Sequence, residues 1–591
     1  MNELLPRPVT FETSPDSFTL SPRASVSGPA ELVDAVRVAL AVLDLRPAGP
    51  EAEPGAIALT HDPSLGREAY TLEVTARGVR IAAGDRAGAF YAGQTLRQLL
   101  PDAAFRTVAG DGWSVPYSRI QDAPRFPWRG VHLDVARHFL PKREVLRMID
   151  LMAVHKLNRL HLHLVDDQGW RVESRVAPRL HEIGSHRPRT IVSRDGQEPV
   201  YDEVPHGGHY TLDDLAEIAG YARARAVTIV PEIDVPGHAS AILAAYPSLD
   251  ARATDGRRPE PFTVLDRWGI SSAILSPLPS TIDFLTAVID EILAALGETP
   301  YVHIGGDECV LDDWAASPEI AAFQAELGLE SPSDLHAWFL RRLADVLAER
   351  GSRAVVWDEA FVSGMLRPDT IVMPWRGPGV AARAAEAGHD IVQTPVFPLY
   401  FDYAEAASED EPLAIGETTT VADVAAYEPA PRSWPAEWRA RVLGAQFQLW
   451  SERLPDARAV DYRAWPRGCA LAEITWSGTI DVVEAGSSGS DGSNGSDGSG
   501  ADGPDLPGSG RSDSGSGLSG AAGADFEARL ARHLGRLDAL GVEYRPPAGP
   551  RPWQLGGNGH RRHRPGVVKV DEVMKHLEEM THVADSTRPS M

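Results

Sequence analysis

The sequence predicts an α/β protein whose main unit is a (β/α)8 TIM barrel, preceded by a small α+β domain. Between residues 129 and 476, about eight short apolar runs alternate with amphipathic helical segments, the pattern of repeated β/α units. Nearly every run ends in side chains capable of chemistry, and a closed barrel gathers all of its strand ends around one mouth. An open doubly wound sheet would use mainly the ends beside its switch point, so the pattern favours the barrel.

The small α+β domain is predicted for residues 1–123, where short β-rich runs mix with helical stretches. Apolar residues alternate along residues 70–75 and 78–83, which predicts two strands joined at the turn of Arg77 and Gly78. Residues 31–43 and 87–100 have the composition and spacing of helices.

The barrel is predicted for residues 124–545. Its strand candidates are residues 130–136, 159–165, 228–234, 301–307, 354–359, 370–375, 390–395 and 443–450. Their C-terminal ends carry Asp134, Arg137, Asp166, Asp167, Glu232, Asp234, Asp307, Glu308, Asp358, Glu359, Trp375, Gln393, Trp450 and Glu452. Helices are expected at residues 142–156, at 212–226 with Thr211 as N-cap, and at 333–351 with Gly351 at the end.

The C-terminal part of the chain contains an insertion and a tail. Residues 486–523 are mostly Gly, Ser and Asp, a composition that buries too little apolar surface to offset the entropy of ordering. We therefore expect a disordered, acidic insertion. The apolar residues between Phe526 and Leu540 have helical spacing, which predicts a last barrel helix after the insertion. Residues 546–591 are expected to be a poorly ordered tail.

The charge balance and the cysteine content exclude several classes of function. Fifty-seven Lys and Arg against 83 Asp and Glu give a net charge of −26, which argues against nucleic acid or anionic membranes as partners. The two cysteines, Cys309 and Cys469, lie far apart and form no zinc or dithiol motif. The N-terminus lacks a basic segment followed by an apolar run, so we expect a cytoplasmic protein. The oligomeric state is left open.

The most specific motif is HIGGDE, residues 303–308. Two glycines after a strand allow unusual backbone angles and the close approach of a ligand. The adjacent carboxylates of Asp307 and Glu308 repel each other, which raises the pKa of at least one and lets it hold a proton near neutral pH. General acid catalysis requires such a group. Most Asp-Glu pairs on solvated loops have no function, but this pair follows an apolar strand and two glycines.

Aromatic residues are concentrated near the same strand ends. Trp357, Trp375 and Trp450 fall at or near three of them, and Tyr400 follows the seventh run. A single Trp more often packs in a core. Three at strand ends, together with carboxylates and Arg137, favour the wall of a carbohydrate pocket.

Two histidine motifs allow different interpretations. Asp234 and His238 follow the third strand candidate, where one could orient the other and tune a neighbouring acid, although a purely structural pair is equally open. His161 and His163 alternate on the second strand and could bind a divalent metal, as in a metal-dependent hydrolase. No further His is found on the last four strand candidates, so that ligand set is incomplete.

Taken together, the motifs resemble glycoside hydrolase family 20, the β-N-acetylhexosaminidases. The matching stretches, from Trp128 to Glu452, are WRGVHLDVARHF, LHLHLVDDQGW, VPEIDVPGHA, HIGGDE, VVWDE, YFD and QLWSE. The resemblance implies exo-acting hydrolysis of terminal β-linked GlcNAc or GalNAc with retention, without metal or cofactor. It also implies substrate assistance, in which the 2-acetamido oxygen of the substrate attacks the anomeric carbon and forms an oxazolinium intermediate.

The resemblance also implies a role for each site residue. Glu308 is expected to be the general acid and base, Asp307 to orient the acetamido N–H, and Tyr400 to bind the acetamido carbonyl. The expected substrate-binding residues are Arg137, Asp402 and Glu452 for the hydroxyls, Trp357, Trp375 and Trp450 for the acetamide and the sugar face, and Asp166, Asp234 and His238 around Glu308. A catalytically silent carbohydrate-binding relative is the alternative, although binding alone does not require both Asp307 and Glu308.

Overall fold

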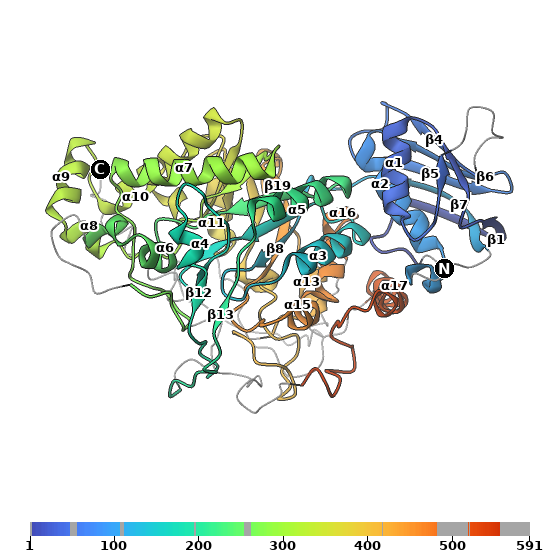
Figure 1. Cartoon of the computed structure of the whole chain (residues 1–591). Coiled ribbons are helices and arrows are strands. Elements are labelled where there is room, and N and C mark those ends of the chain that lie inside the picture. The colour runs from blue at the N-terminus through green and yellow to red at the C-terminus, as the bar shows by residue number, and fades with distance from the viewer. Residues whose placement is uncertain are drawn as a thin grey trace, which may run out of the picture.

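The computed structural model describes residues 3–47, 56–106, 112–193, 197–252, 262–416, 418–480, 518 and 520–555 (Figure 1). The predicted disordered insertion at 486–523 and the predicted tail at 546–591 fall largely outside the described residues. The described residues form the first domain, the barrel and the helix that follows the insertion.

The first domain contains a seven-stranded sheet, counted among the described residues, with the order β1-β7-β5-β6-β4-β2-β3. The strands are β1 (Thr10–Leu20), β2 (Ser25–Ser27), β3 (Arg46–Pro47), β4 (Ile57–His61), β5 (Tyr70–Thr75), β6 (Gly78–Ala83) and β7 (Trp113–Asp122). The helices are α1 (Ala30–Ala39) and α2 (Arg86–Leu99), followed by the short 3-10 helix η1 (Asp102–Phe105). Antiparallel pairing of Thr75 with Gly78 confirms the predicted hairpin.

The second unit is a closed barrel of eight parallel strands in the order β14-β15-β16-β17-β18-β19-β8-β9. The strands are β8 (Trp128–Asp134), β9 (Arg159–His163), β14 (Thr228–Glu232), β15 (Tyr301–His303), β16 (Arg353–Trp357), β17 (Ile371–Met373), β18 (Ile391–Gln393) and β19 (Val442–Leu449). Each overlaps a predicted run, although most of the strands are shorter than predicted or are shifted by one or two residues. Pairing of β19 with β8 closes the barrel, which confirms the TIM barrel and excludes the open sheet.

The helices of the barrel unit lie between and after these strands. The longer ones are α3 (Lys142–Val154), α5 (Leu212–Ala224), α7 (Pro279–Leu296), α9 (Pro318–Glu326), α10 (Pro332–Glu349), α11 (Pro378–Glu386), α15 (Ala457–Ala464) and α16 (Arg467–Trp476). The shorter ones are α4 (Arg179–Glu182), α6 (Ser240–Ala245), η2 (Pro247–Leu249), α8 (Asp312–Ala316), η4 (Ala360–Ser363), α12 (Val396–Leu399), α13 (Val421–Ala426) and α14 (Ala436–Arg439). Thr211 caps α5, as predicted, in a capping box with Asp214.

Two small hairpins and one further helix complete the described structure. The hairpins are β10 (Val165–Asp166) with β11 (Gly169–Trp170), and β12 (His186–Arg187) with β13 (His206–Gly207). Helix α17 (Gly520–Ala539) contains the helical residues predicted after the insertion, but it begins six residues before Phe526, so the prediction of disorder is wrong for residues 520–523. None of the described helices has the length and apolar character that crossing a bilayer would require.

Helix α17 lies where the two units meet (Figure 1). Its apolar residues, among them Phe526 and Leu537, are buried in the hydrophobic core of the barrel unit. The helix also holds the first domain, because the Arg536 guanidinium donates to the carbonyls of Glu3, at 2.8 Å, and Gln98, at 2.9 Å. The helix therefore fastens the first domain to the barrel.

Candidate active site

The predicted site residues come from eight consecutive β/α connections and meet at the C-terminal ends of the barrel strands. Equivalent positions lie level across this end, since Asp134, His163, Glu232 and His303 pair in register from β8 to β15. The site residues are Arg137 after β8, Asp166 after β9, Asp234 and His238 after β14, Asp307 and Glu308 after β15, Trp357 on β16, Trp375 after β17, Tyr400 and Asp402 after β18, and Trp450 and Glu452 after β19.

The two glycines of HIGGDE let the acid pair approach Asp234. Gly305 has a φ of +62°, and a Cβ there would lie 1.7 Å from the Asp234 Oδ1 atom. The Gly306 N–H donates to the same oxygen at 3.2 Å. Glu308 itself has a φ of +51°, a left-handed conformation that is costly for a residue with a side chain and is typical of functional sites.

His238 connects the acid pair with the carboxylates of the loop after β9. Its Nδ1 atom lies 3.3 Å from Asp166 Oδ1 and 3.3 Å from Asp167 Oδ2, and its Nε2 atom lies 3.4 Å from Glu308 Oε2 and 3.7 Å from Asp307 Oδ2. Burial opposes a charge on this ring, but the surrounding carboxylates, Asp166 first, raise its pKa well above the ordinary value. His238 therefore lies between two pairs of carboxylates that favour the protonated form of its ring.

Several acids at the mouth have raised pKa values. For Asp307 the first cause is burial and the second is the charge of Asp234, while the adjacent Glu308 contributes less than either. Burial also raises the pKa of Asp234 to about 7, and that of Glu359 to about 8. Repulsion within the Asp-Glu pair, which the sequence suggests as the cause of a raised pKa, is therefore a smaller cause than burial.

Arg137 lies among the carboxylates on the other side of the site. Its Nη2 atom is 2.6 Å from Asp166 Oδ2 and its Nη1 atom is 3.5 Å from Asp134 Oδ2. Its guanidinium carbon lies 5.0 Å from the centre of the Trp450 ring. Burial disfavours the charge, but Asp166 and Asp134 hold the pKa of Arg137 well above its usual range.

The aromatic residues form one cluster with different exposures. Trp375 and Trp450 keep 8% and 9% of their surface exposed, whereas Trp357 keeps only 1%. The Trp375 indole N–H donates to Glu359 Oε2 at 3.1 Å, and that of Trp357 donates to Glu232 Oε1 at 2.9 Å. The rings of Tyr400 and Trp450 lie 6.1 Å apart. The four predicted aromatic residues are thus brought together, with Trp357 the deepest.

Some buried carboxylate oxygens at the mouth have no hydrogen-bond partner within the described part of the chain. They are Asp234 Oδ2, Asp307 Oδ1, Asp402 Oδ1 and Glu452 Oε2. Burial, and then the charge of Glu452, raise the pKa of Asp402 well above its ordinary value. An unpaired buried acceptor is costly in a folded protein, so such atoms indicate where the hydroxyl or N–H groups of a ligand bind.

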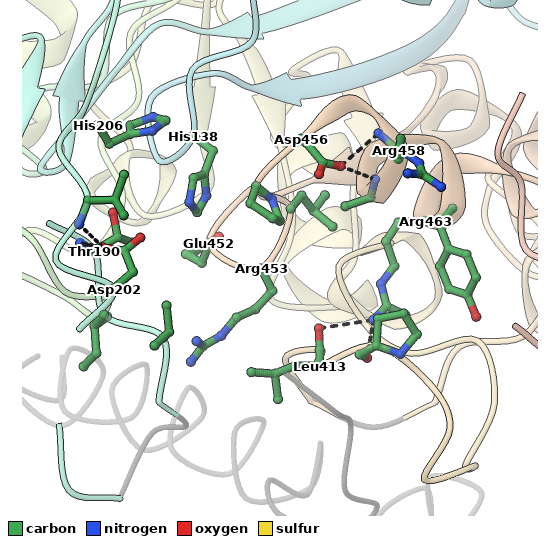
Figure 2. A pocket seen from close by; sticks show the side chains of 18 of the residues that line it. His138, Thr190, Asp202, His206, Leu413, Glu452, Arg453, Asp456, Arg458 and Arg463 are labelled. Carbon is green, nitrogen blue, oxygen red and sulfur yellow. Dashed lines mark hydrogen bonds between the residues drawn. The ribbon is translucent and has the colours of Figure 1, made fainter. Parts of the chain in front are cut away.

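A cavity of about 330 Å³ borders the site at Glu452. Glu452 and His138, the neighbour of Arg137, both line it, together with Thr190, Asp202 and Arg453 (Figure 2). Neither Asp307 nor Glu308 is among its lining residues. The cavity therefore lies beside the predicted hydroxyl-binding residues and not at the acid pair.

The two histidines of the metal alternative face a protein carboxylate. His161 Nε2 lies 3.0 Å from Glu232 Oε2, and Gln446 donates to its other ring nitrogen at 3.0 Å. His163 contacts Glu232 through Nδ1 and lies 3.1 Å from Asp166 Oδ2 through Nε2. All four of these ring nitrogens therefore have protein groups within contact distance.

Asp167, Glu232 and Glu359 also belong to the site, although the sequence patterns assign them no role beyond their place at strand ends. Asp167 faces His238, and Glu359 accepts the Trp375 indole N–H. Their position directly beside the predicted residues in VDDQ, PEID and WDE is the available signal. Their contacts with residues on other strands assign them to the site, and the spacing of residues along the sequence does not reveal those contacts.

Comparison with known proteins gives a consistent result. The family model for the catalytic domain of glycosyl hydrolase family 20 matches residues 126–479, and that for domain 2 of the same family matches residues 1–123. Among curated proteins, a beta-hexosaminidase of Porphyromonas gingivalis is 37% identical over 488 residues, which are 80% of this chain and 60% of that protein. A beta-hexosaminidase of Vibrio furnissii is 36% identical over 424 residues, 70% of this chain and 66% of that protein.

A solved structure agrees in fold as well as in sequence. The GH20 exo β-N-acetylglucosaminidase from Vibrio harveyi, in complex with N-acetylglucosamine, matches with a TM-score of 0.73 and 31% identity. The match covers 92% of this chain and 78% of that one. The chain spans less than two thirds of the length of the two curated relatives. Since the family model of the catalytic domain covers more than half of the chain, the protein belongs to glycosyl hydrolase family 20.

Proposed function

We propose that this protein is an exo-acting β-N-acetylhexosaminidase that removes terminal β-linked GlcNAc or GalNAc with retention of configuration. The observation that carries the proposal is the contrast within the acid pair. Asp307 is largely buried, with one oxygen unpaired among the described residues, while the neighbouring Glu308 side chain keeps 29% of its surface exposed. One carboxylate is placed to receive a substrate group in the interior, and the other can reach a leaving group that extends toward solvent.

In the first chemical step, Glu308 donates its proton to the glycosidic oxygen. The bond between that oxygen and the anomeric carbon breaks, and the acetamido oxygen of the same sugar forms a new bond to the anomeric carbon. The positive charge of the resulting oxazolinium falls beside Asp307. In the second step Glu308 takes a proton from water, whose oxygen attacks the anomeric carbon. The bond between that carbon and the acetamido oxygen breaks, which opens the oxazolinium ring and restores the acetamide.

Asp307 has to be ionised when the oxazolinium forms. Burial without a partner keeps its pKa high in the free protein. The substrate acetamido N–H supplies the missing donor to the unpaired oxygen, which lowers the pKa and favours the ionised form. Binding of the acetamide therefore prepares the charge that the intermediate requires, which links recognition to catalysis.

The remaining predicted residues fit recognition of a neutral sugar. Arg137 with Glu452 and Asp402 offers donors and unpaired acceptors for hydroxyl groups on one side of the site. Tyr400 lies at the edge of the cluster of Trp residues, where its O–H is suited to donate a hydrogen bond to the acetamido carbonyl. A carbohydrate is therefore the proposed partner, and the proposal needs no metal or cofactor.

The test is hydrolysis of a chromogenic β-N-acetylglucosaminide by wild type, Glu308→Gln and Asp307→Asn. Asp312→Asn, an exposed carboxylate four residues after Glu308, is the matched control. We expect large losses in the two site variants, an active control, strong inhibition by a thiazoline that mimics the oxazolinium, and activity that survives a chelator. Equal turnover of a β-glucoside, which has no acetamide, would exclude substrate assistance, and an inactive wild type would exclude the function.

A further inference from the structure

A group of buried titratable side chains fills the interior of the barrel directly below the acid pair. Its members are His132, His161, His163, Glu232 and His303, from four neighbouring strands, and each is fully buried. The proposed reaction uses none of them. Their arrangement has a clear centre, because four of the described contacts converge on the carboxylate of Glu232.

Glu232 is held as an anion by N–H donors. Its Oε1 atom accepts the Trp357 indole N–H at 2.9 Å, and its Oε2 atom contacts His163 Nδ1. His161 Nε2 lies 3.0 Å from Oε2 without making a hydrogen bond to it, and Gln446 donates to His161 Nδ1 at 3.0 Å. Burial disfavours the charge, but His163 and the other rings lower the pKa of Glu232 well below its ordinary value.

His163 lies between two carboxylates. Nδ1 contacts Glu232, and Nε2 lies 3.1 Å from Asp166 Oδ2 and 3.4 Å from the donor Arg137 Nη1. Burial opposes a charge on this ring, but Glu232 and Asp166 raise the pKa of His163 well above its ordinary value. His163 therefore joins two carboxylates at a place that solvent does not reach.

From His163 the contacts continue to the acid pair. Asp166 Oδ2 also receives Arg137 at 2.6 Å, and Asp166 Oδ1 lies 3.3 Å from His238 Nδ1. His238 Nε2 lies 3.4 Å from Glu308 Oε2. One continuous series therefore runs Trp357, Glu232, His163, Asp166, His238, Glu308, and from Glu232 onward carboxyl groups and histidine rings alternate.

We propose that Glu232 and His163 are positioning residues of the reaction: this buried ion pair fixes Asp166, and through it His238 and Glu308, while the same carboxylate holds the Trp357 indole in place. The inference rests on the proposed function. Alternating charges in a buried row lock each rotamer, since a side chain that turns away leaves its neighbour as an unpaired buried ion. Neither residue touches the reacting atoms.

The test compares Glu232→Gln with His163→Gln in the pH profile of kcat/KM. The charged and titratable groups around the pair stay in place in both variants: Asp134, Arg137 and His132 from β8 and its loop, His161 and Asp166 from β9 and its loop, Asp234 from the β14 loop, and His303 from β15. Removing an anion lowers the apparent pKa of the acids above it, and removing a cation raises it.

We therefore expect opposite shifts of the alkaline limb, down for Glu232→Gln and up for His163→Gln, each by roughly 1 pH unit. The double variant returns the limb toward wild type. The value of kcat falls in both single variants by about 10-fold or more, with KM changed less. Glu232→Asp keeps the charge and should keep the wild-type limb even though its shorter side chain lowers kcat.

Asp122→Asn is the matched control, because Asp122 is also a buried carboxylate that pairs with a cation, Lys156 at 2.7 Å, and accepts a Trp indole N–H, from Trp476 at 2.8 Å. Asp122→Asn should lower the free energy of unfolding and leave the alkaline limb of the kcat/KM profile at its wild-type pH. Shifts in the same direction for both variants, or unmoved limbs in folded variants, overturn the inference while leaving the proposed function intact.

A wild-type measurement keeps the inference testable if the variants do not fold. In the ¹⁵N spectrum of histidine-labelled protein we expect His163 and His238 to keep their imidazolium signals above the pH at which free histidine loses its own. A spectrum with at most one such signal above that pH would overturn it. An inactive wild type with both signals present would instead reject the proposed function alone.

Discussion

The barrel mouth and the junction between the two units both bury carboxylates, but these carboxylates differ in how many of their oxygens have hydrogen-bond partners. At the junction, Asp122 accepts from Tyr70 at 2.6 Å, from Lys156 at 2.7 Å and from Trp476 at 2.8 Å. At the mouth, oxygens of Asp307, Asp402 and Glu452 have no partner in the described part of the chain. The Asp122 carboxylate at the junction is therefore fully hydrogen-bonded, whereas the carboxylates at the mouth keep oxygens to which a ligand can donate.

The difference shows which buried charges stabilise the fold and which serve function. A buried ion with all of its hydrogen-bond partners becomes destabilising when one partner is removed. A buried ion that lacks partners is costly in the free protein and gains them when a ligand binds. A carboxyl group whose pKa is raised and one of whose oxygens has no hydrogen-bond partner, as at Asp307 and Asp402, therefore marks the site more reliably than burial alone.

The largest expected effect is a loss of kcat when Asp is replaced by Asn at the mouth. The same replacement at the junction should affect stability instead. Asp307→Asn should lower kcat about 10²- to 10³-fold, because it removes the charge that faces the oxazolinium. It should leave the free energy of unfolding unchanged or raise it, since burial disfavours the charge and the Oδ1 atom of Asp307 has no hydrogen-bond partner among the described residues. Kinetics on an N-acetylglucosaminide and denaturant unfolding measure the two quantities.

Asp122→Asn should behave in the opposite way. It leaves Lys156 as a buried, unpaired cation, so the free energy of unfolding should fall by about 3–5 kcal/mol while kcat/KM of the folded protein stays near wild type. A large loss of turnover in folded Asp122→Asn protein would show that the junction takes part in function and would remove the distinction.

The next effect concerns the backbone that brings the acid pair to Asp234. Gly305→Ala places a methyl group 1.7 Å from the Asp234 Oδ1 atom at a φ of +62°. We expect a loss of about 1–3 kcal/mol in stability and about 10²-fold in kcat/KM, because the acid pair is displaced. Gly351→Ala, at a φ of +79° with open space around it, is the control with similar backbone strain and no effect on turnover.

A smaller effect is the pH dependence of stability, which should have opposite sign in the two regions. Burial raises the pKa of Glu359, at the mouth, to about 8, so its folded form binds more protons than the unfolded chain between about pH 4.5 and 8. The stability that it contributes is thus present at low pH and lost as the pH rises through 8. At the junction, burial opposes the charge of Glu68, but Arg129 lowers its pKa, so its contribution is present above pH 4.5 and lost on acidification.

Glu359→Gln tests this sign. At pH 9 the variant should be more stable than wild type by roughly 1 kcal/mol or more, and the difference should shrink at pH 5, where wild-type Glu359 is protonated. Glu68→Gln should show a deficit at about pH 7 that shrinks toward about pH 3. Equal differences at both pH values would contradict the assigned shifts.

The elements of the fold can be predicted well from the sequence, but the contacts between them only in part. The strands and the Thr211 cap follow from local periodicity and capping chemistry, so the residues themselves locate them. The partners of Glu232 lie on strands 69 to 125 residues away, and no local pattern contains that register. For the same reason the raised pKa of Glu359 and the contact of α17 with the first domain cannot be predicted locally, because both depend on burial by distant segments.

The smallest effect is expected where charges are paired but exposed to solvent. Lys142, at the start of α3, lies 2.6 Å from both Asp214 and Glu217 of α5 on the outer surface of the barrel. Water and salt screen such pairs, and ordering the long side chains costs entropy, so Lys142→Gln should lower the free energy of unfolding far less than Asp122→Asn does and leave kcat/KM unchanged. The loss should diminish further at high ionic strength, whereas that of Asp122→Asn should not, because salt does not enter the buried junction. A salt-independent loss in Lys142→Gln as large as that in Asp122→Asn would mean that the presence of an ion pair, and not its burial, sets its contribution to stability.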